Sequence, residues 1–404
     1  MCILPLVFGG KQTIKIYQKQ KEILNAQIET GENRFFCFNG NQWNQRICRF
    51  RDICFEDNDK NLTFLSPYKI TTQSPLLVLG ARSPPYDKKR DRIYSIKVEI
   101  DRNKTIPENR VIHNETTQYV STYYNMQMLF HSLFDFSLPL FYTFLVIPDL
   151  KYKLKRVAIP NDADFPMNKK FVQAFVDSFG RIKRNHCYKD LIVGMEKVKD
   201  QETGKLYQFP YNFTYHYHPY ILEKFEIIKN RSEITKLIPK KPIILFSGRK
   251  TNRRSLSNYD ELFERMKNEF SEKFDIEKIF YEEHDMATQI EKTYKSSIMI
   301  GIHGSGLSHV CWMRPGTVMV EIFPYRFDCR DWYERTTNVS AVKYFKYVPK
   351  DEEESPGASQ AVKDCWNKTP KCEGNCLDLL RDQNIKVNVE KFIELIKNAA
   401  DQIL

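Results

Sequence analysis

Short apolar runs alternate with more polar segments between residues 240 and 325, and this is the most regular part of the chain. Four of the runs are continuous, as in strands buried on both faces of a sheet: 241–248, 276–281, 297–302 and 317–323. Three segments between them predict helices: 259–274, 286–296 and 307–313. Strands and helices that alternate in this way predict an α/β domain with a parallel, doubly wound sheet.

The rest of the chain has a weaker pattern. Short strands are expected near 76–80, 93–100 and 155–159, and a strongly apolar segment covers 123–146. Residues 350–376 predict a polar loop. A final helix at 389–403 is expected to pack back on one of the domains, with the N-terminal domain as one option. A chain of 404 residues favours two domains, which we place at 1–235 and 236–404.

Composition narrows the class of protein. Hydrophobic residues make up 42% of the chain and aromatic residues 13%, which excludes a disordered chain. The net charge of +11 favours anionic partners: nucleic acid, anionic lipid or phosphate-bearing small molecules. Because the 62 basic and 51 acidic residues are mixed along the chain, a solvated mixed-charge surface is favoured over nucleic-acid binding.

Cysteines and glycosylation triplets favour an oxidising compartment. The cysteines include two clusters, Cys37, Cys48 and Cys54 and then Cys365, Cys372 and Cys376. Neither cluster has a nearby His or a second Cys pair at metal-ligand spacing, so disulfides are favoured over zinc and no metal site is expected. Seven Asn-x-Ser/Thr triplets begin at Asn61, Asn103, Asn114, Asn212, Asn230, Asn338 and Asn367. We therefore expect the lumen of the endoplasmic reticulum or Golgi.

The N-terminus gives no targeting signal that supports this location. Residues 3–8 are apolar, but the run is too short for a signal-peptide core or a membrane span. Either a signal or anchor is missing from this chain or the protein is cytosolic. We expect the first, so that membrane association depends on an anchor outside this chain.

Two segments that follow predicted strands carry groups suited to phosphate. The segment 247–258 holds Arg249, Arg253 and Arg254, whose guanidinium groups suit a diphosphate; a solvated basic loop is the alternative. The second segment is a glycine turn that opens a helix, where backbone N–H groups and His303 suit phosphate oxygens, although glycine turns also occur for other reasons. This turn consists of His303, Gly304, Ser305, Gly306 and Leu307.

Three further acidic and histidine positions are candidates. Glu321 interrupts an apolar strand and needs a partner, either a nucleotide ribose or an internal Arg or Lys. His131 and Asp135 lie four residues apart on one helical face, which suits a general base as well as it suits a structural pair. His216 and His218 would face opposite sides of a strand, and we interpret them as structural.

Three segments together resemble glycosyltransferase family 61. Residues 300–325, IGIHGSGLSHVCWMRPGTVMVEIFPY, are similar to its most diagnostic motif, His-Gly-small-Gly-Leu followed by Pro-Gly-x3-Val-Glu. Residues 247–262 resemble its Arg-rich block, and residues 125–141 resemble its N-terminal His-x3-Asp segment. The three occur in order, and the resemblance covers most of the chain. Within the family it is strongest to members that transfer N-acetylglucosamine to protein-linked acceptors.

The resemblance implies a GT-B fold, in which two Rossmann-like domains face a cleft. It implies that the N-terminal domain binds the acceptor, a glycoprotein or glycan, and that the C-terminal domain binds a UDP-sugar, UDP-N-acetylglucosamine. It also implies inversion at the anomeric carbon and no required metal or other cofactor. A catalytically inactive secreted protein of the same fold that binds nucleotide or carbohydrate is the alternative.

The resemblance also implies roles for individual residues. The diphosphate ligands would be Arg249, Arg254, Asn258, His303, Gly304 and Gly306. Glu321 would bind the ribose, and His131 and Asp135 would lie near the acceptor. The family has Arg directly after the strand serine, whereas Gly248 precedes Arg249 here, so the register of this loop is open by one residue.

Overall fold

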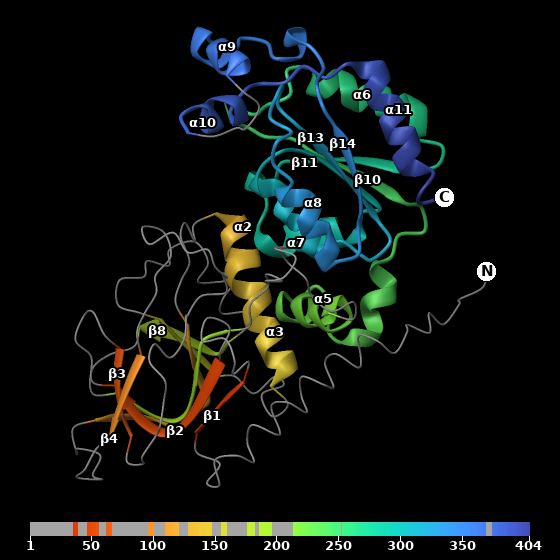
Figure 1. Cartoon of the computed structure of the whole chain (residues 1–404). Helices are drawn as coiled ribbons and strands as arrows, with labels where there is room; N and C mark the ends of the chain where they lie inside the picture. The colour runs from red at the N-terminus through yellow and green to blue at the C-terminus, as the bar shows by residue number, and fades with distance from the viewer. Residues whose placement is uncertain are drawn as a thin grey trace. The chain divides into compact units, whose positions relative to one another are not determined.

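The computed structural model describes two compact units, residues 1–212 and 213–404 (Figure 1). The described residues are 35–38, 47–55, 62–66, 96–100, 110–120, 128–147, 155–159, 176–181, 186–195, 213–251, 253–368 and 374–404. The domain boundary expected at residues 235 and 236 stays a prediction.

The C-terminal unit is built on a parallel five-stranded sheet. Its strands are β10 Ile243–Ser247, β11 Asp275–Ile279, β12 Ile298–Ile302, β13 Val318–Ile322 and β14 Lys343–Tyr347. Their order in the sheet is β11-β10-β12-β13-β14, and every neighbouring pair is parallel. The first four strands confirm the expected alternation, and β14 is a strand that the sequence pattern did not predict.

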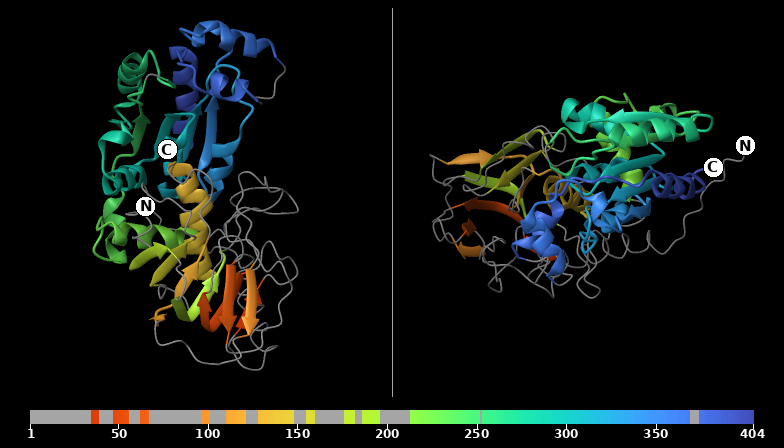
Figure 2. Two further views of the ribbon diagram at one scale, coloured as in Figure 1. Left: turned by 90° about the vertical axis from the view of Figure 1, so that its left-hand side faces the viewer. Right: turned by 90° about the horizontal axis from the view of Figure 1, so that it is seen from above.

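Helices cover this sheet through amphipathic faces. Helices α6 (Tyr259–Phe270) and α11 (Val389–Ala400) lie side by side (Figures 1 and 2) and bury apolar side chains against Ile244, Ile300 and Val320. The terminal helix therefore packs within its own unit. Leu245 points to the opposite face, where α7 (Met286–Lys295) contacts β10. The short helix expected at 307–313 is a 3-10 helix, η4, Ser305–Trp312.

The strand order determines where a ligand site can form. After β10 the chain forms β11 on one side of β10. It then returns to form β12 on the other side of β10, and β13 and β14 follow in the same direction. In open α/β sheets, ligands bind at the carboxyl ends of the two strands where the winding reverses direction. In this sheet those strands are β10 and β12, which end at Ser247 and Ile302. The two segments singled out from the sequence follow these strands.

This unit has further helices besides those that cover the sheet. They are α5 Phe213–Lys224, η2 Arg231–Leu237, η3 Tyr281–Glu283, α8 Trp332–Thr336, η5 Thr337–Val339, η6 Glu352–Glu354, α9 Gln360–Asn367 and α10 Cys376–Arg381. Helix α9 contradicts the loop expected over 350–376. Ser359 caps it, and Val362, Cys365 and Trp366 pack into a small apolar cluster.

The N-terminal unit contains a mixed sheet. Its described strands are β1 Phe35–Phe38, β2 Ile47–Phe55, β3 Leu62–Ser66, β4 Ile96–Ile100, β5 Val111–His113, β6 Thr117–Tyr119, β7 Arg156–Ile159, β8 Ser178–Arg181 and β9 His186–Val193. The order is β4-β3-β2-β9-β6-β7-β8, with β1 paired to β2 and β5 paired to β9. Strands β4 and β7 confirm two predicted strands, and residues 76–80 lie outside the described residues.

One long helical segment carries the candidate base. It consists of α2 Leu129–Ser132, a π-helical turn Leu133–Ser137 and α3 Leu138–Val146. Most of its side chains are buried, which explains why this segment is so apolar. π-Helical turns inside α-helices occur frequently at functional sites.

Disulfides and exposed sequons fit an oxidising compartment. Cys54 joins β2 to Cys187 in β9, and Cys365 joins α9 to Cys376 in α10; helices α9 and α10 lie next to each other (Figures 1 and 2). The four sequon asparagines among the described residues are all exposed: Asn114, Asn230, Asn338 and Asn367. Within the described residues, no helix has both the length and the apolar character needed to cross a bilayer.

The segment that holds His216 and His218 is helical, so its interpretation as a strand was wrong. Both histidines belong to α5. His218 is buried, and its Nε2 donates a hydrogen bond to the carbonyl of Cys311 at 2.9 Å. Burial lowers the pKa of His218 from 6.5 to about 4, because the charged ring would be desolvated.

This buried histidine predicts a pH dependence of stability. The unfolded chain takes up the proton of His218 near pH 6.5, whereas the folded chain resists it down to about pH 4. Stability is therefore complete above pH 6.5 and falls as the pH drops toward 4, by about 1.4 kcal/mol per pH unit. We expect His218→Gln to flatten this slope in urea unfolding curves collected between about pH 5 and 6.5.

His216→Gln is the matched control, because His216 lies on the same helix and is half-exposed. It should keep the slope of the parent protein. Identical slopes for the parent and His218→Gln would contradict the assignment of a neutral, buried His218.

Candidate functional site

Two arginine side chains lie against the glycine turn. A Cβ atom placed on Gly304 would lie 2.9 Å from Nη1 of Arg249 and 3.3 Å from Nη1 of Arg254. The segments that follow β10 and β12 therefore meet, as the strand order requires. Glycine is needed at this position because any side chain would press on the arginines.

Both arginines carry buried donors. Nη1 of Arg249 and Nε of Arg254 are buried and have no hydrogen-bond partner among the described residues. Burial lowers the pKa of Arg249. Burial, together with the positive charge of Arg249, lowers the pKa of Arg254 to about 10. Two desolvated like charges, each with a buried donor that makes no hydrogen bond, form a site that an anion would stabilise.

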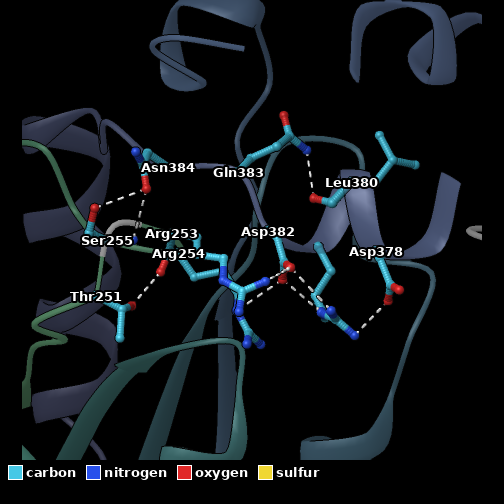
Figure 3. Close-up of polar contacts among 10 residues, drawn as sticks. Thr251, Arg253, Arg254, Ser255, Asp378, Leu380, Asp382, Gln383 and Asn384 are labelled. Carbon is cyan, nitrogen blue, oxygen red and sulfur yellow. Dashed lines mark hydrogen bonds and ion pairs between the residues drawn. The ribbon is translucent and has the colours of Figure 1, made fainter. Parts of the chain in front are cut away.

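Arg254 is held in a strained backbone conformation by a distant segment. Its φ of 55° lies in the left-handed region, which a residue with a side chain adopts only when its surroundings impose it. The next residue, Ser255, donates from its N–H and Oγ to Oδ1 of Asn384 at 3.3 and 3.0 Å (Figure 3). Leu256 also forms a parallel bridge with Ile385. These contacts hold the backbone that directly follows Arg254.

Asp382 supplies a carboxylate to Arg253 and Arg254, and sequence analysis missed it. It accepts from Arg253 Nη1 at 3.1 Å and from Arg381 Nε at 2.8 Å, and it forms an ion pair with Arg254 Nε at 3.3 Å (Figure 3). Burial alone would raise the pKa of Asp382, but the hydrogen bond from Arg381 and the charges of Arg254 and Arg253 hold it below its ordinary value. No sequence spacing links Asp382 to Arg253, because 129 residues separate them.

Asn258 ties the arginine loop to the same distant segment. It stands at the start of α6 but makes no side-chain cap. Its Nδ2 donates to the carbonyl of Val387 at 2.9 Å, and its Oδ1 accepts from the N–H of Val387 at 3.0 Å. A role for Asn258 as a phosphate ligand would require these bonds to break.

Leu307 holds the glycine turn against strand β12. Leu307 is buried, and its Cδ2 would lie 3.0 Å from a Cβ placed on Gly301 in β12. The first turn of η4 closes with the N–H of Leu307 donating to the carbonyl of Gly304 at 2.9 Å. The N–H groups of Ser305 and Gly306 come before this bond, in the position where helix N-termini have donors to spare.

Glu321 has partners other than the Arg or Lys considered from the sequence. Its Oε1 lies 2.5 Å from Nδ1 of His303, and its Oε2 accepts from the hydroxyl of Tyr344 at 2.6 Å. The Glu321 side chain is 0% exposed, and that of His303 is 1% exposed. Tyr344 belongs to β14, so the absence of this strand from the sequence-based pattern is the reason the contact was missed.

The two candidates in the N-terminal unit do form a pair. Nδ1 of His131 lies 2.6 Å from Oδ2 of Asp135, and Asp135 belongs to the π-helical turn. The side chains are 21% and 11% exposed. Among the described residues, no group of three or more His, Cys, Asp or Glu side chains is placed to hold a metal ion.

Residues 129–320 match the family model of glycosyltransferase 61. The chain carries a glycosyltransferase 61 domain. That domain includes the His131–Asp135 pair, both arginines and the Gly304 turn, and it ends one residue before Glu321.

Curated relatives of this chain are transferases by name. The EGF domain-specific O-linked N-acetylglucosamine transferase of Drosophila melanogaster is 26% identical over 188 residues, which is 44% of this chain and 32% of the relative. A xylan glycosyltransferase of Arabidopsis thaliana is 25% identical over 253 residues, 55% and 48% of the two chains. The protein O-linked-mannose beta-1,4-N-acetylglucosaminyltransferase 2 of Homo sapiens is 22% identical over 320 residues, 71% and 51%. The matched part spans about half the length of these relatives or less.

Proposed function

We propose that the chain is an inverting glycosyltransferase that uses a UDP-sugar. In this proposal it transfers N-acetylglucosamine to a protein-linked glycan or to a Ser/Thr hydroxyl in the secretory pathway. The glycosyltransferase 61 domain supports glycosyl transfer, and two of the relatives are named for N-acetylglucosamine. The observation that carries the nucleotide part is the pair of buried guanidinium groups beside Gly304.

A diphosphate suits this site in charge and in geometry. Its oxygens would accept from Arg249, Arg254 and the N–H groups at the start of η4, which offsets the desolvation of the guanidinium groups. When the bond between sugar and diphosphate breaks, negative charge grows on the diphosphate. Fixed donors at that position stabilise the transition state more than the ground state.

The chemical step is a single displacement. The acceptor hydroxyl gives its proton to Asp135 or His131, and its oxygen attacks the anomeric carbon from the face opposite UDP. A glycosidic C–O bond forms as the C–O bond to the diphosphate breaks, and UDP leaves with the electron pair. The configuration at the anomeric carbon therefore inverts.

A GT-B architecture is part of the proposal. The order of strands in the C-terminal unit is that of a doubly wound nucleotide-binding fold. The His131–Asp135 pair belongs to the other unit, which supports an assignment of the acceptor to the N-terminal unit.

Removal of Arg254 should weaken nucleotide binding. We expect Arg254→Ala to raise the Kd for UDP, measured by isothermal titration calorimetry, about 10- to 100-fold, the effect of losing a hydrogen bond to a charged group. UDP-N-acetylglucosamine should be affected by a similar factor.

Arg265→Ala is the matched control, because it removes one positive charge from an ion pair on α6 in the same unit. It should leave the Kd unchanged. An unchanged Kd for Arg254→Ala as well would remove the arginine loop from the nucleotide site.

UDP binding by the parent chain without sugar transfer over a broad panel of donors and acceptors would favour the inactive alternative.

Loss of the candidate base should affect turnover rather than nucleotide binding. We expect Asp135→Asn to lower kcat about 100- to 10,000-fold, the range of general-base catalysis, and to leave the Kd for UDP unchanged. Transfer of radiolabelled sugar measures the first quantity and calorimetry the second. Asp177→Asn, at an exposed ion pair of the same unit, is the control. Full turnover by Asp135→Asn would reassign the base.

A further inference from the structure

His303, Glu321 and Tyr344 form a chain of side chains across three neighbouring strands. Both carboxylate oxygens of Glu321 have a partner, Nδ1 of His303 on one side and the hydroxyl of Tyr344 on the other. Burial and the negative charge of Glu321 raise the pKa of Tyr344, so its hydroxyl remains the donor. Because the Glu321 side chain is also 0% exposed, a ligand could reach the carboxylate only by displacing one of these partners.

The sheet determines this arrangement. Glu321 in β13 lies opposite Gly301 in β12, and the N–H of His303 donates to the carbonyl of Ile322 at 2.9 Å. Tyr344 in β14 lies opposite Met319 in β13. The histidine ring is therefore held at the end of β12, directly before the Gly304 turn, by a group on the next strand.

This arrangement argues against a direct contact between Glu321 and a ribose. Ribose hydroxyls would have to displace His303 or Tyr344 from a side chain that is 0% exposed, and a buried donor would lose its acceptor. The family resemblance implied the ribose role, and the structure favours a different one.

The histidine ring is fixed on all sides except one nitrogen. The rings of Phe323, Phe327, Trp332 and Tyr333 lie within 5.0 to 5.8 Å of its centroid. Because Nδ1 faces the carboxylate, the ring carries a proton there, and a carboxylate that holds one nitrogen in this way sets the tautomer and orientation of the other. Among the described residues, Nε2 has no hydrogen-bond partner, whereas Nδ1 pairs with Glu321.

We propose that Glu321 is a positioning residue that acts through His303. It holds the ring so that Nε2 meets the diphosphate beside Gly304, and it balances the charge of the imidazolium when Nε2 donates to a phosphate oxygen. Tyr344 in turn holds Glu321. This inference rests on the proposed nucleotide site, and it assigns Glu321 to the phosphate end of the ligand rather than to the ribose.

Pyrophosphate and UDP distinguish the two roles, because pyrophosphate has no ribose. The Kd of each is measured by calorimetry for the parent chain, Glu321→Gln, His303→Asn and the double variant. We expect Glu321→Gln to weaken both ligands by a similar factor, about 5- to 50-fold, and to have no further effect in the His303→Asn background. Thermal unfolding of each variant without ligand shows whether it is folded.

A loss for UDP alone, or the same loss with and without His303, would overturn the inference and return Glu321 to the ribose. Should Glu321→Gln fail to fold, Tyr344→Phe carries the same test, since it removes only the hydroxyl that holds Glu321. We expect it to weaken both ligands less strongly, and no change in either would overturn the inference. Failure of the parent chain to bind UDP at all would instead overturn the proposed function.

Discussion

The structure of the site depends on an imbalance of charge at the ends of two strands. Arg249 and Arg254 converge on Gly304 with their guanidinium groups partly desolvated, and a buried donor on each lacks a hydrogen-bond partner among the described residues. The carboxylate of Asp382 contacts Arg254 but is shared with Arg253 and Arg381. A folded protein tolerates such an arrangement when a ligand completes it, and a diphosphate brings the charge and the acceptors that are missing.

The conformation that creates this imbalance is maintained from a distance. The left-handed backbone of Arg254 costs about 1–3 kcal/mol, the range for a residue held in a sparsely populated conformation. Two hydrogen bonds from Ser255 to Asn384 and two between Asn258 and Val387 oppose this cost, each contributing about 0.5–1.5 kcal/mol. Their sum, about 2–6 kcal/mol, is of the same size as the strain or larger, so the segment after α10 helps to hold the arginine loop in its conformation.

The sequence predicted what local patterns encode. Apolar runs and helical spacing located β10 to β13, α6, α7 and α11, and the parallel order followed from their alternation. It missed β14, since two lysines interrupt the run Lys343–Tyr347 at the edge of the sheet, and it missed α9 inside a polar segment. The arginines and the glycine turn were found because each follows a strand.

Contacts between segments that are far apart in the chain could not be predicted from the sequence. Nothing in the spacing of residues shows that Asp382 meets Arg253, that Asn258 pairs with Val387, or that Tyr344 donates to Glu321. The helical spacing of His131 and Asp135 did predict a pair, because both belong to one element. The sequence therefore identified the residues at the strand ends but not the groups that orient them.

A crystal structure of the chain with UDP bound tests the central claim most directly. The account predicts that phosphate oxygens lie within hydrogen-bond distance of Arg249 or Arg254 and of the backbone N–H groups of Ser305 and Gly306. UDP bound with its diphosphate away from Gly304, while both arginines keep their present surroundings, would contradict it.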